Sequence, residues 1–251
     1  MTGTPFDEHY FHTGPYARVS YRRFSQYWWS NRFYAALIRR YRPGGGALLE
    51  VGCGLGHLLA RLEAAYDVVG VDVNASALRQ AAAVAPRARL LEGSAEDLSQ
   101  FPDAIFSVVI AKHVVEHLGR PEKAVAEFGR ILSPGGILIV ATPNLDSPMH
   151  ATKKGAWVGY KDPTHIALHR PQVWLDWIRK SGLQPVRVLS DGFWDPPYMP
   201  ILPLPLQKLV FGLPGGIQAI LGLPLLPLSW GESMIVVARR LSSTPRHPHG
   251  G

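Results

Sequence analysis

The sequence predicts an α/β protein with a mainly parallel sheet. Apolar runs that suit buried strands alternate with helical patterns along residues 46–144. Such alternation produces parallel strands joined by right-handed crossovers. The first run, residues 48–51, leads into glycines at alternate positions, 52, 54 and 56. Because glycine permits a tight turn and close approach of a ligand to the main chain, we expect a nucleotide-type site there.

The spacing of this turn narrows the type of ligand. The dinucleotide fingerprint G-x-G-x-x-G requires a third glycine where this chain has His57, so the pattern here is G-x-G-x-G. A second apolar run ends in Asp72, 22 residues after Glu50. An acid at about that distance hydrogen-bonds a ribose diol in nucleotide-binding α/β units. The two features predict a nucleoside site without a pyrophosphate.

Four later segments follow in an order that is typical of one family. They are the strand and loop of residues 89–98, the strand 105–111, the Glu116-His117 pair, and the helix, Pro-Gly-Gly turn and strand of 128–140. With these motifs the chain resembles the class I S-adenosylmethionine-dependent methyltransferases. The resemblance implies a Rossmann-like three-layer fold, with a seven-stranded, mainly parallel sheet and an antiparallel last strand. It also implies S-adenosyl-L-methionine as the cofactor.

The resemblance assigns cofactor contacts to individual residues. Glu50 is expected to approach the methionine end, Asp72 to hold the ribose, and Val73 to pack on the adenine. Ser94 and the Ala95 amide are expected at the adenine edge, although many relatives have Asp in place of Ser94. The full expected set is Glu50, Gly52, Gly54, Gly56, Asp72, Val73, Ser94, Ala95 and Ala111. In the amino-terminal segment, Arg18 and Tyr16 are either cofactor contacts or ordinary surface and packing residues.

Two histidines are the candidate catalytic residues. Methyl transfer mainly requires alignment of donor and acceptor, and a base helps when the acceptor is a hydroxyl. His113 follows the strand 105–111, at the sheet edge where ligands bind. His165 lies in a block, residues 143–169, that resembles a "PN…W…DPxH" subgroup acting on quinone precursors, sugars and lipid-linked glycans. Asp162, His165 and His169 are weak evidence for a metal, and we predict none.

Composition restricts the partners. The net charge is +7 and 18% of residues are charged, but no dense Lys/Arg run appears. We therefore expect a small-molecule or lipid-like acceptor and no nucleic acid. The single cysteine, Cys53, cannot form an internal disulfide, which fits a reducing compartment. No signal-peptide pattern opens the chain, so a cytoplasmic location is expected; the oligomeric state is left open.

The predicted organisation has three parts. Residues 1–43 form an aromatic, basic helical cap with a helix over 25–41; residues 44–240 form the methyltransferase domain; residues 241–251 form a disordered tail. Within the domain we expect a helix over 171–181 and strands at 185–190 and 233–239. The sequence contains no internal repeats.

An uncharged stretch stands out within the domain. Residues 191–231 form a Pro/Leu-rich insertion between the last two strands, and no charge occurs from Leu209 to Gly231. Its prolines and glycines are expected to break any continuous helix. Three interpretations stay open: a lid over the active site, peripheral membrane contact through 198–230, or a buried loop or oligomer contact.

The sequence thus predicts methyl transfer from S-adenosylmethionine to a small or amphipathic acceptor, at oxygen. Two alternatives remain. One is a nicotinamide-dependent oxidoreductase, against which His57 argues; the other is a catalytically silent module that binds the same cofactor.

Overall fold

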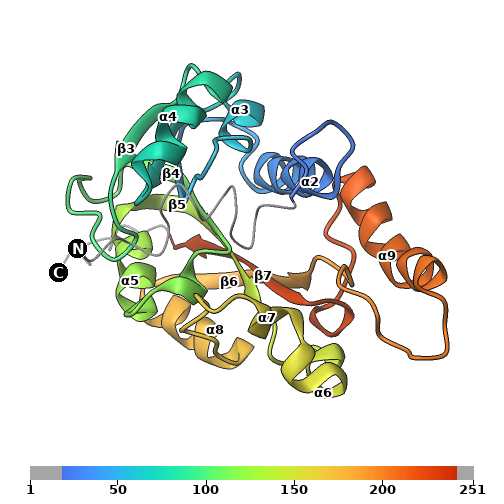
Figure 1. The fold of residues 1–251 in the computed structure, drawn as a ribbon. Helices are drawn as coiled ribbons and strands as arrows, with labels where there is room; N and C mark the ends of the chain where they lie inside the picture. Colours follow the sequence, from blue (N-terminus) through green and yellow to red (C-terminus); the bar gives the residue numbers. More distant parts are fainter. Residues whose placement is uncertain (1–18, 242–251) are drawn as a thin grey trace, which may run out of the picture.

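A computed structural model describes residues 19–241 of the chain. Its centre is one seven-stranded sheet in the order β3-β2-β1-β4-β5-β7-β6 (Figure 1). β7 pairs antiparallel with both of its neighbours, and the other pairings are parallel. This confirms the predicted sheet and its antiparallel last strand. The strands are β1 Ala47–Val51, β2 Asp67–Asp72, β3 Arg89–Glu92, β4 Phe106–Lys112, β5 Leu132–Pro143, β6 Leu183–Ser190 and β7 Ser233–Arg240.

Helices cover both faces of the sheet. Alternate residues of the central strands enter two separate cores, because successive side chains of a strand point to opposite faces. One core contains side chains of α5 and α8; the other contains those of α2, α3 and α9. The helices are α2 Gln26–Tyr41, α3 Leu59–Leu62, α4 Ala75–Val84, α5 Pro121–Ile131, α6 Pro148–Lys153, α7 Val158–Lys161, α8 Pro171–Lys180 and α9 Leu204–Leu221, with short 3₁₀ turns η1 Val115–His117, η2 Lys154–Ala156 and η3 Leu228–Trp230.

Helix α2 begins where its sequence predicts. The Ser25 hydroxyl accepts a hydrogen bond from the Trp28 amide, and the chain leaves the helix just before Pro43. Ser is a favoured N-cap because its oxygen satisfies an amide that lacks an intrahelical partner. Tyr16 and Arg18, the other candidates of the amino-terminal segment, lie outside the described residues.

The insertion differs from the prediction. An 18-residue helix, α9, runs through Pro214, Gly215 and Gly216 and ends at Gly222, which has φ 66°. A proline inside a helix removes one hydrogen bond and costs about 3 kcal/mol. Packing of the later part of α9 against α2, which lies beside it (Figure 1), contributes to offsetting this cost. Among the described residues, no helix is both long and apolar enough to cross a membrane.

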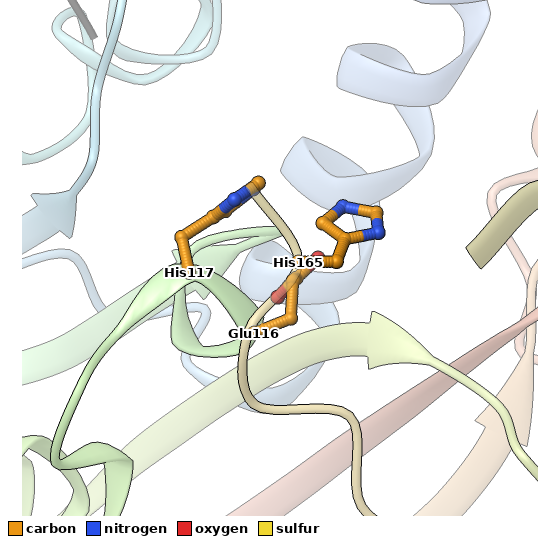
Figure 2. Close-up of side chains that lie close together, drawn as sticks. All are labelled: Glu116, His117 and His165. Atoms are coloured by element: carbon orange, nitrogen blue, oxygen red, sulfur yellow. The ribbon is translucent and has the colours of Figure 1, made fainter. Parts of the chain in front are cut away.

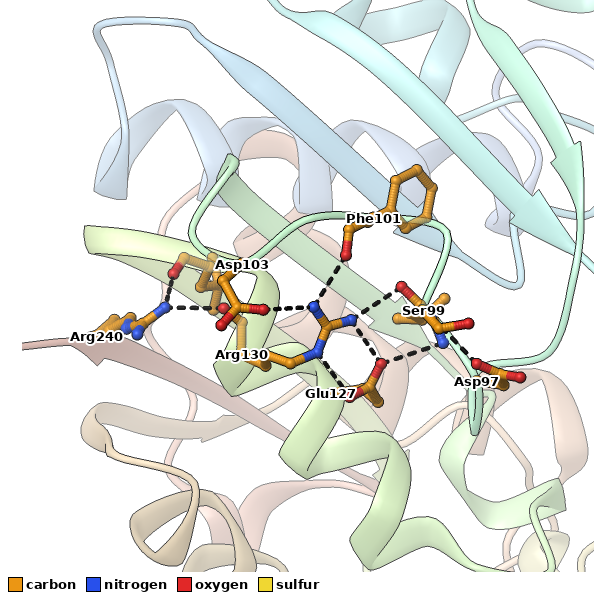
Figure 3. Close-up of polar contacts among 9 residues, drawn as sticks. Asp97, Ser99, Phe101, Asp103, Glu127, Arg130 and Arg240 are labelled. Carbon is orange, nitrogen blue, oxygen red and sulfur yellow. Dashed lines mark hydrogen bonds and ion pairs between the residues drawn. The ribbon is translucent and has the colours of Figure 1, made fainter.

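A polar network joins the loop before β4 to α5. The Arg130 guanidinium donates to the carbonyls of Leu98 and Phe101 and forms ion pairs with Asp103 and Glu127 (Figure 3). The Arg240 guanidinium in turn donates to the Arg130 carbonyl. These contacts attach β7 and the 98–103 loop to the same helix, on the side of the sheet opposite the ligand-binding edge.

Candidate functional site

A cavity lies where the order of strands reverses. From β1 the chain continues to β2 and β3 on one side of β1 in the sheet. It then crosses to β4, which pairs with the other side of β1. Open α/β sheets bind ligands at such a point, beyond the carboxyl ends of the strands. A cavity of about 470 Å³ opens there, lined by the ends of β1, β2 and β4 and by residues of α2.

The glycine turn forms one wall of this cavity. Gly52 and Gly54 have φ values of 68° and 50°, which side-chain-bearing residues rarely adopt. A Cβ atom on Gly52 would lie 2.3 Å from Cγ2 of Val114, so the wall has no room for a side chain there. The Gly54 amide donates to Oδ2 of Asp72 over 2.8 Å, and the Asn74 amide donates to Oδ1 over 2.9 Å. Asp72 therefore shapes the turn in addition to facing the cavity.

Glu50 and Lys112 form a buried pair of ionisable groups at the cavity. The Glu50 side chain is 3% exposed, and its Oε2 has no hydrogen-bond partner. Burial raises the pKa of Glu50 to about 8, although Lys112 lowers it. Burial likewise lowers the pKa of Lys112 to about 8, although the negative charge of Glu50 raises it. The Lys112 ammonium also donates to Asn31 and lies 4.7 Å from the ring centre of Tyr27.

His113 stands at the end of β4, in the cavity wall. Its backbone has φ 53°, and its Nδ1 lies 3.0 Å from Oε1 of Glu116. Burial lowers the pKa of His113, but the hydrogen bond and charge of Glu116 and the charge of Asp191 together raise it above its usual value. A carboxylate that accepts from Nδ1–H leaves Nε2 as the acceptor nitrogen, which is the state a general base needs.

His165, unlike His113, does not line the cavity. Its Nδ1–H donates to the Gly159 carbonyl over 2.7 Å, and its ring centre is 4.7 Å from that of His117, which does line the cavity. Figure 2 shows both rings beside Glu116. The donor atoms of Glu116, His117 and His165 lie within 4.8 Å of one another.

This trio differs from the one considered in the sequence. The Asp162 Oδ1 accepts from the amide and hydroxyl of Thr164, and the His169 ring packs against Trp174 and Trp177. The structure therefore does not gather Asp162, His165 and His169 as one ligand set. The expectation that the protein needs no metal stays a prediction.

The remaining predicted contacts divide into two groups. Val73, Ser94 and Ala95 line the cavity with Glu50, Gly52, Gly54 and Asp72. Gly56 and Ala111 do not line it. A Cβ on Gly56 would lie 3.0 Å from the Ala81 side chain, so its lack of one allows the turn to pack on α4. Ala111 is fully buried in β4, one residue before the strand reaches the cavity.

Some cavity residues were not predicted from the sequence. Tyr27 and Ser30 come from α2, Lys112 from the end of β4, and Glu96 from the loop after β3. The position of Lys112 after an apolar strand was a usable signal, since parallel strands end at the ligand edge. Nothing local marks Tyr27 or Ser30, because the packing of α2 on the sheet alone places them there.

The cavity has the features that an S-adenosylmethionine site needs. It combines a turn without side chains, an acceptor carboxylate at the end of β2 and an unpartnered buried carboxylate oxygen on Glu50. A carboxylate can accept both protons of a diol, and a buried carboxylate can pair with an ammonium group. The cavity also has the volume of a small-molecule site, about 300–1,000 Å³.

Comparison with known proteins agrees with this geometry. Residues 49–140 match the model of a methyltransferase domain. A probable S-adenosylmethionine-dependent methyltransferase of Mycolicibacterium smegmatis is 34% identical over 121 residues, which is 47% of this chain and 46% of that protein. A ubiquinone biosynthesis O-methyltransferase of a Caulobacter species is 36% identical over 123 residues, 43% of this chain and 48% of that protein. The chain thus spans about half the length of the curated relatives it matches.

Solved structures share the fold over most of the chain. A possible histamine N-methyltransferase of Thermotoga maritima superposes with a TM-score of 0.59 at 19% identity, over 84% of this chain and 89% of that one. A geranyl diphosphate C-methyltransferase of Streptomyces coelicolor superposes with a TM-score of 0.56 at 15% identity, over 83% and 78%. Residues 49–140 therefore match a methyltransferase domain, the curated relatives named here are similar to this part of the chain, and the solved structures show that the chain has the fold of S-adenosylmethionine-dependent methyltransferases.

Proposed function

We propose that this protein transfers a methyl group from S-adenosylmethionine to the oxygen of a small or amphipathic acceptor. The observation that carries the proposal is the cavity at the ends of β1 and β4, where a cofactor-type wall faces His113. A sulfonium-bound methyl group is already activated, so the protein's task is alignment and removal of the acceptor proton. The relative named as a ubiquinone biosynthesis O-methyltransferase supports oxygen as the acceptor atom.

The wall residues divide the task of holding the cofactor. We infer that Asp72 binds the ribose diol through the lone pairs left by its two backbone donors. Glu50 faces the methionine ammonium, Gly52 and Gly54 allow close main-chain contact, and Val73, Ser94 and Ala95 surround the adenine. Gly56 and Ala111 support these contacts from behind the wall.

For the general base, His113 has the stronger geometric support. It lines the cavity, and Glu116 orients its Nδ1. His165 reaches the cavity wall only through His117. A base must lie within hydrogen-bond reach of the proton that it removes. We therefore propose His113 as the base and His165 as a residue that positions His117.

The test is transfer of labelled methyl from S-adenosylmethionine into fractionated cell extract, followed by mass identification of the product. His113→Asn should lower transfer by about a hundredfold or more, the usual contribution of a general base, with unchanged binding of S-adenosylhomocysteine. His165→Asn, the matched control, should retain more activity. A protein that binds the cofactor but methylates no fraction would instead be a silent binding module.

The amphipathic class of acceptor is supported by α9. Its outward residues Leu209, Leu213 and Ile217 are 59%, 52% and 43% exposed, an unusual cluster for a water-facing helix. Lys208 is the single charged residue of segment 196–231. We propose that this face rests on a membrane surface, as amphipathic interfacial helices do, and that the "PN…W…DPxH" block places the enzyme among those acting on quinone precursors, sugars or lipid-linked glycans.

A further inference from the structure

A second cavity lies between α2 and α9. It has a volume of about 180 Å³ and is lined by the rings of Trp29, Phe33 and Trp194 and by Ala219 and Ile220. Gly215 and Gly216 of α9 also line it and add no side chain. Ile220 is about half exposed, so this end of the cavity reaches the surface of the apolar helix. These residues give the cavity a largely apolar wall, to which Gln26, Ser30, Asp191 and Gln218 add polar groups.

Polar groups also line this cavity. Asp191 and Tyr34 line it, and the Tyr34 side chain is 2% exposed with a hydroxyl that has no partner. The Asp191 Oδ1 accepts from the Ser233 amide over 3.2 Å. Asp191 also lies near enough to His113 for its charge to act on that ring. The Nζ of Lys112, which lines the first cavity next to His113, lies 5.5 Å from the Tyr34 ring centre, so the polar groups of the second cavity adjoin the first.

Ser30 joins the two cavities, because it lines both. The polar Gln218 does not compete for a ligand, since its amide group already bonds the Ser190 carbonyl and the amides of Leu225 and Leu226. An acceptor bound between α2 and α9 would thus contact the apolar walls together with Ser30, Tyr34 and Asp191, on the side that adjoins the first cavity.

We propose that the cavity between α2 and α9 binds the hydrocarbon chain of the methyl acceptor and directs the hydroxyl of that acceptor toward His113. The proposal rests on the proposed methyl transfer and names its substrate class: a hydroxyl compound with a linear or isoprenoid apolar chain. The volume is below that of a site for a whole small molecule, about 300–1,000 Å³, which suits a chain segment. The unpartnered Tyr34 hydroxyl and Asp191 supply hydrogen-bonding groups for the head.

The probe is a series of straight-chain alcohols from butanol to dodecanol, titrated into the full chain saturated with S-adenosylhomocysteine. Affinity should rise by about fourfold for each methylene that enters the cavity and level off when the cavity is full. Filling the cavity with Gly216→Leu should weaken dodecanol binding by about tenfold or more. A Cβ at Gly216 meets nothing within 4 Å, so the substitution is compatible with the fold.

Two control variants distinguish dodecanol binding in the cavity from binding elsewhere on α9. Gly212→Leu makes the same change one turn earlier in α9, outside the cavity lining, and should leave dodecanol affinity unchanged. Leu213→Gln alters only the outward face and should also leave it unchanged. If Gly216→Leu proves unstable, quenching of Trp29 fluorescence by 12-bromo-1-dodecanol, and its loss in Trp29→Phe, tests the same position.

Equal dodecanol affinity in the parent and in a folded Gly216→Leu variant would overturn the proposal, as would absence of binding in the parent. Loss of binding in Leu213→Gln with retention in Gly216→Leu would move the site to the outer face of α9 and would also contradict it. Because these titrations need no turnover, they are independent of the methyl-transfer assay. A protein that binds S-adenosylhomocysteine but not dodecanol would refute this inference alone.

Discussion

At the scale of single residues, two carboxylates of the cavity differ in what they do. Asp72 accepts two backbone hydrogen bonds and so holds the glycine turn in place. Glu50 keeps one oxygen without a partner in a buried position. An unsatisfied buried acceptor is costly unless a ligand completes it, so Glu50 is the group whose state should change most when the cofactor binds.

Substitution of Asp72 tests the ribose contact. Asp72→Ala should weaken S-adenosylhomocysteine binding by about 10- to 100-fold, because a hydrogen bond to a charged group is worth about 1.5–3 kcal/mol. Isothermal titration calorimetry measures the change. Asp67→Asn, at the exposed opposite end of the same strand, is the matched control and should bind normally. Unchanged affinity in Asp72→Ala would exclude the ribose contact.

The raised pKa of Glu50 predicts a pH dependence of stability. Burial raises the pKa of Glu50 from 4.5 to about 8, so between these pH values the folded state holds a proton that the unfolded state has lost. The contribution of Glu50 to the free energy of unfolding should therefore fall as pH rises from about 4.5 to about 8 and be constant above that.

Glu50→Gln should abolish the decrease in the free energy of unfolding that Glu50 causes between about pH 4.5 and pH 8. The variant should therefore gain stability relative to the parent as pH rises. Urea unfolding at pH 5 and pH 8 measures it, with the exposed Glu122→Gln on α5 as a control. Parallel pH profiles for the parent and Glu50→Gln would contradict the assignment. The same variant should bind S-adenosylhomocysteine more weakly, because it cannot carry the charge that pairs with an ammonium group.

At the scale of elements, α9 buries its polar side chains and exposes most of its apolar ones. Its two glutamines, Gln207 and Gln218, are 1% exposed, while most of its leucines and isoleucines face outward. Each glutamine bonds backbone groups of the neighbouring loops: Gln207 reaches residues 198–202, and Gln218 reaches Ser190 and residues 225–226. The polar face of this helix therefore holds the insertion together.

This arrangement predicts an unusual mutational pattern. Gln218→Leu should destabilise the protein by about 2–5 kcal/mol, because it removes the buried partner of the Ser190 carbonyl and of the Leu226 amide, and an unsatisfied buried group costs about 1–3 kcal/mol. Chemical denaturation measures the loss. Leu221→Gln, on the exposed side of the same helix, should change stability by less than about 0.5 kcal/mol. A stable Gln218→Leu protein would show that the loop bonds contribute little.

Some helices and strands can be predicted from sequence patterns alone, and others cannot. The sequence predicted a helix over 25–41 and the central strands, since helix-ending residues and apolar runs are local properties. The helix through Pro214 was wrongly excluded. Its local sequence disfavours a helix, and it forms because α2 and the buried glutamines supply contacts distant in the sequence.

At the scale of the whole molecule, charge and apolar surface act together. The chain carries a net charge of +7. Arg32 of α2 donates to the Ile220 carbonyl, and Arg187 of β6 donates to the Pro224 carbonyl, so two exposed cations flank the end of α9. Basic residues beside an apolar helix favour an anionic lipid surface.

Vesicle binding tests this proposal. The full chain should cosediment with vesicles that contain phosphatidylserine and less with pure phosphatidylcholine, and added salt should weaken the binding because it screens the charges. Replacing Leu209, Leu213 and Ile217 with Gln should lower vesicle affinity by about tenfold or more, given about 1.5–3 kcal/mol for each buried side chain. Ile166→Gln, equally exposed but distant from α9 in the sequence, is the control. Identical binding by all three proteins would contradict membrane contact.

The sequence by itself determined the sheet, its ligand edge and the class of cofactor, because the glycine turn, Asp72 and the strand periodicities are local and ordered along the chain. Only the tertiary structure decided which residues of α2 enter the cavity, that His113 and not His165 lines it, and that a second cavity adjoins it. Those features depend on the packing of α2 and α9 against each other and against the sheet. Such packing joins residues about 190 positions apart, as Arg32 and Ile220 show, and no local pattern encodes it.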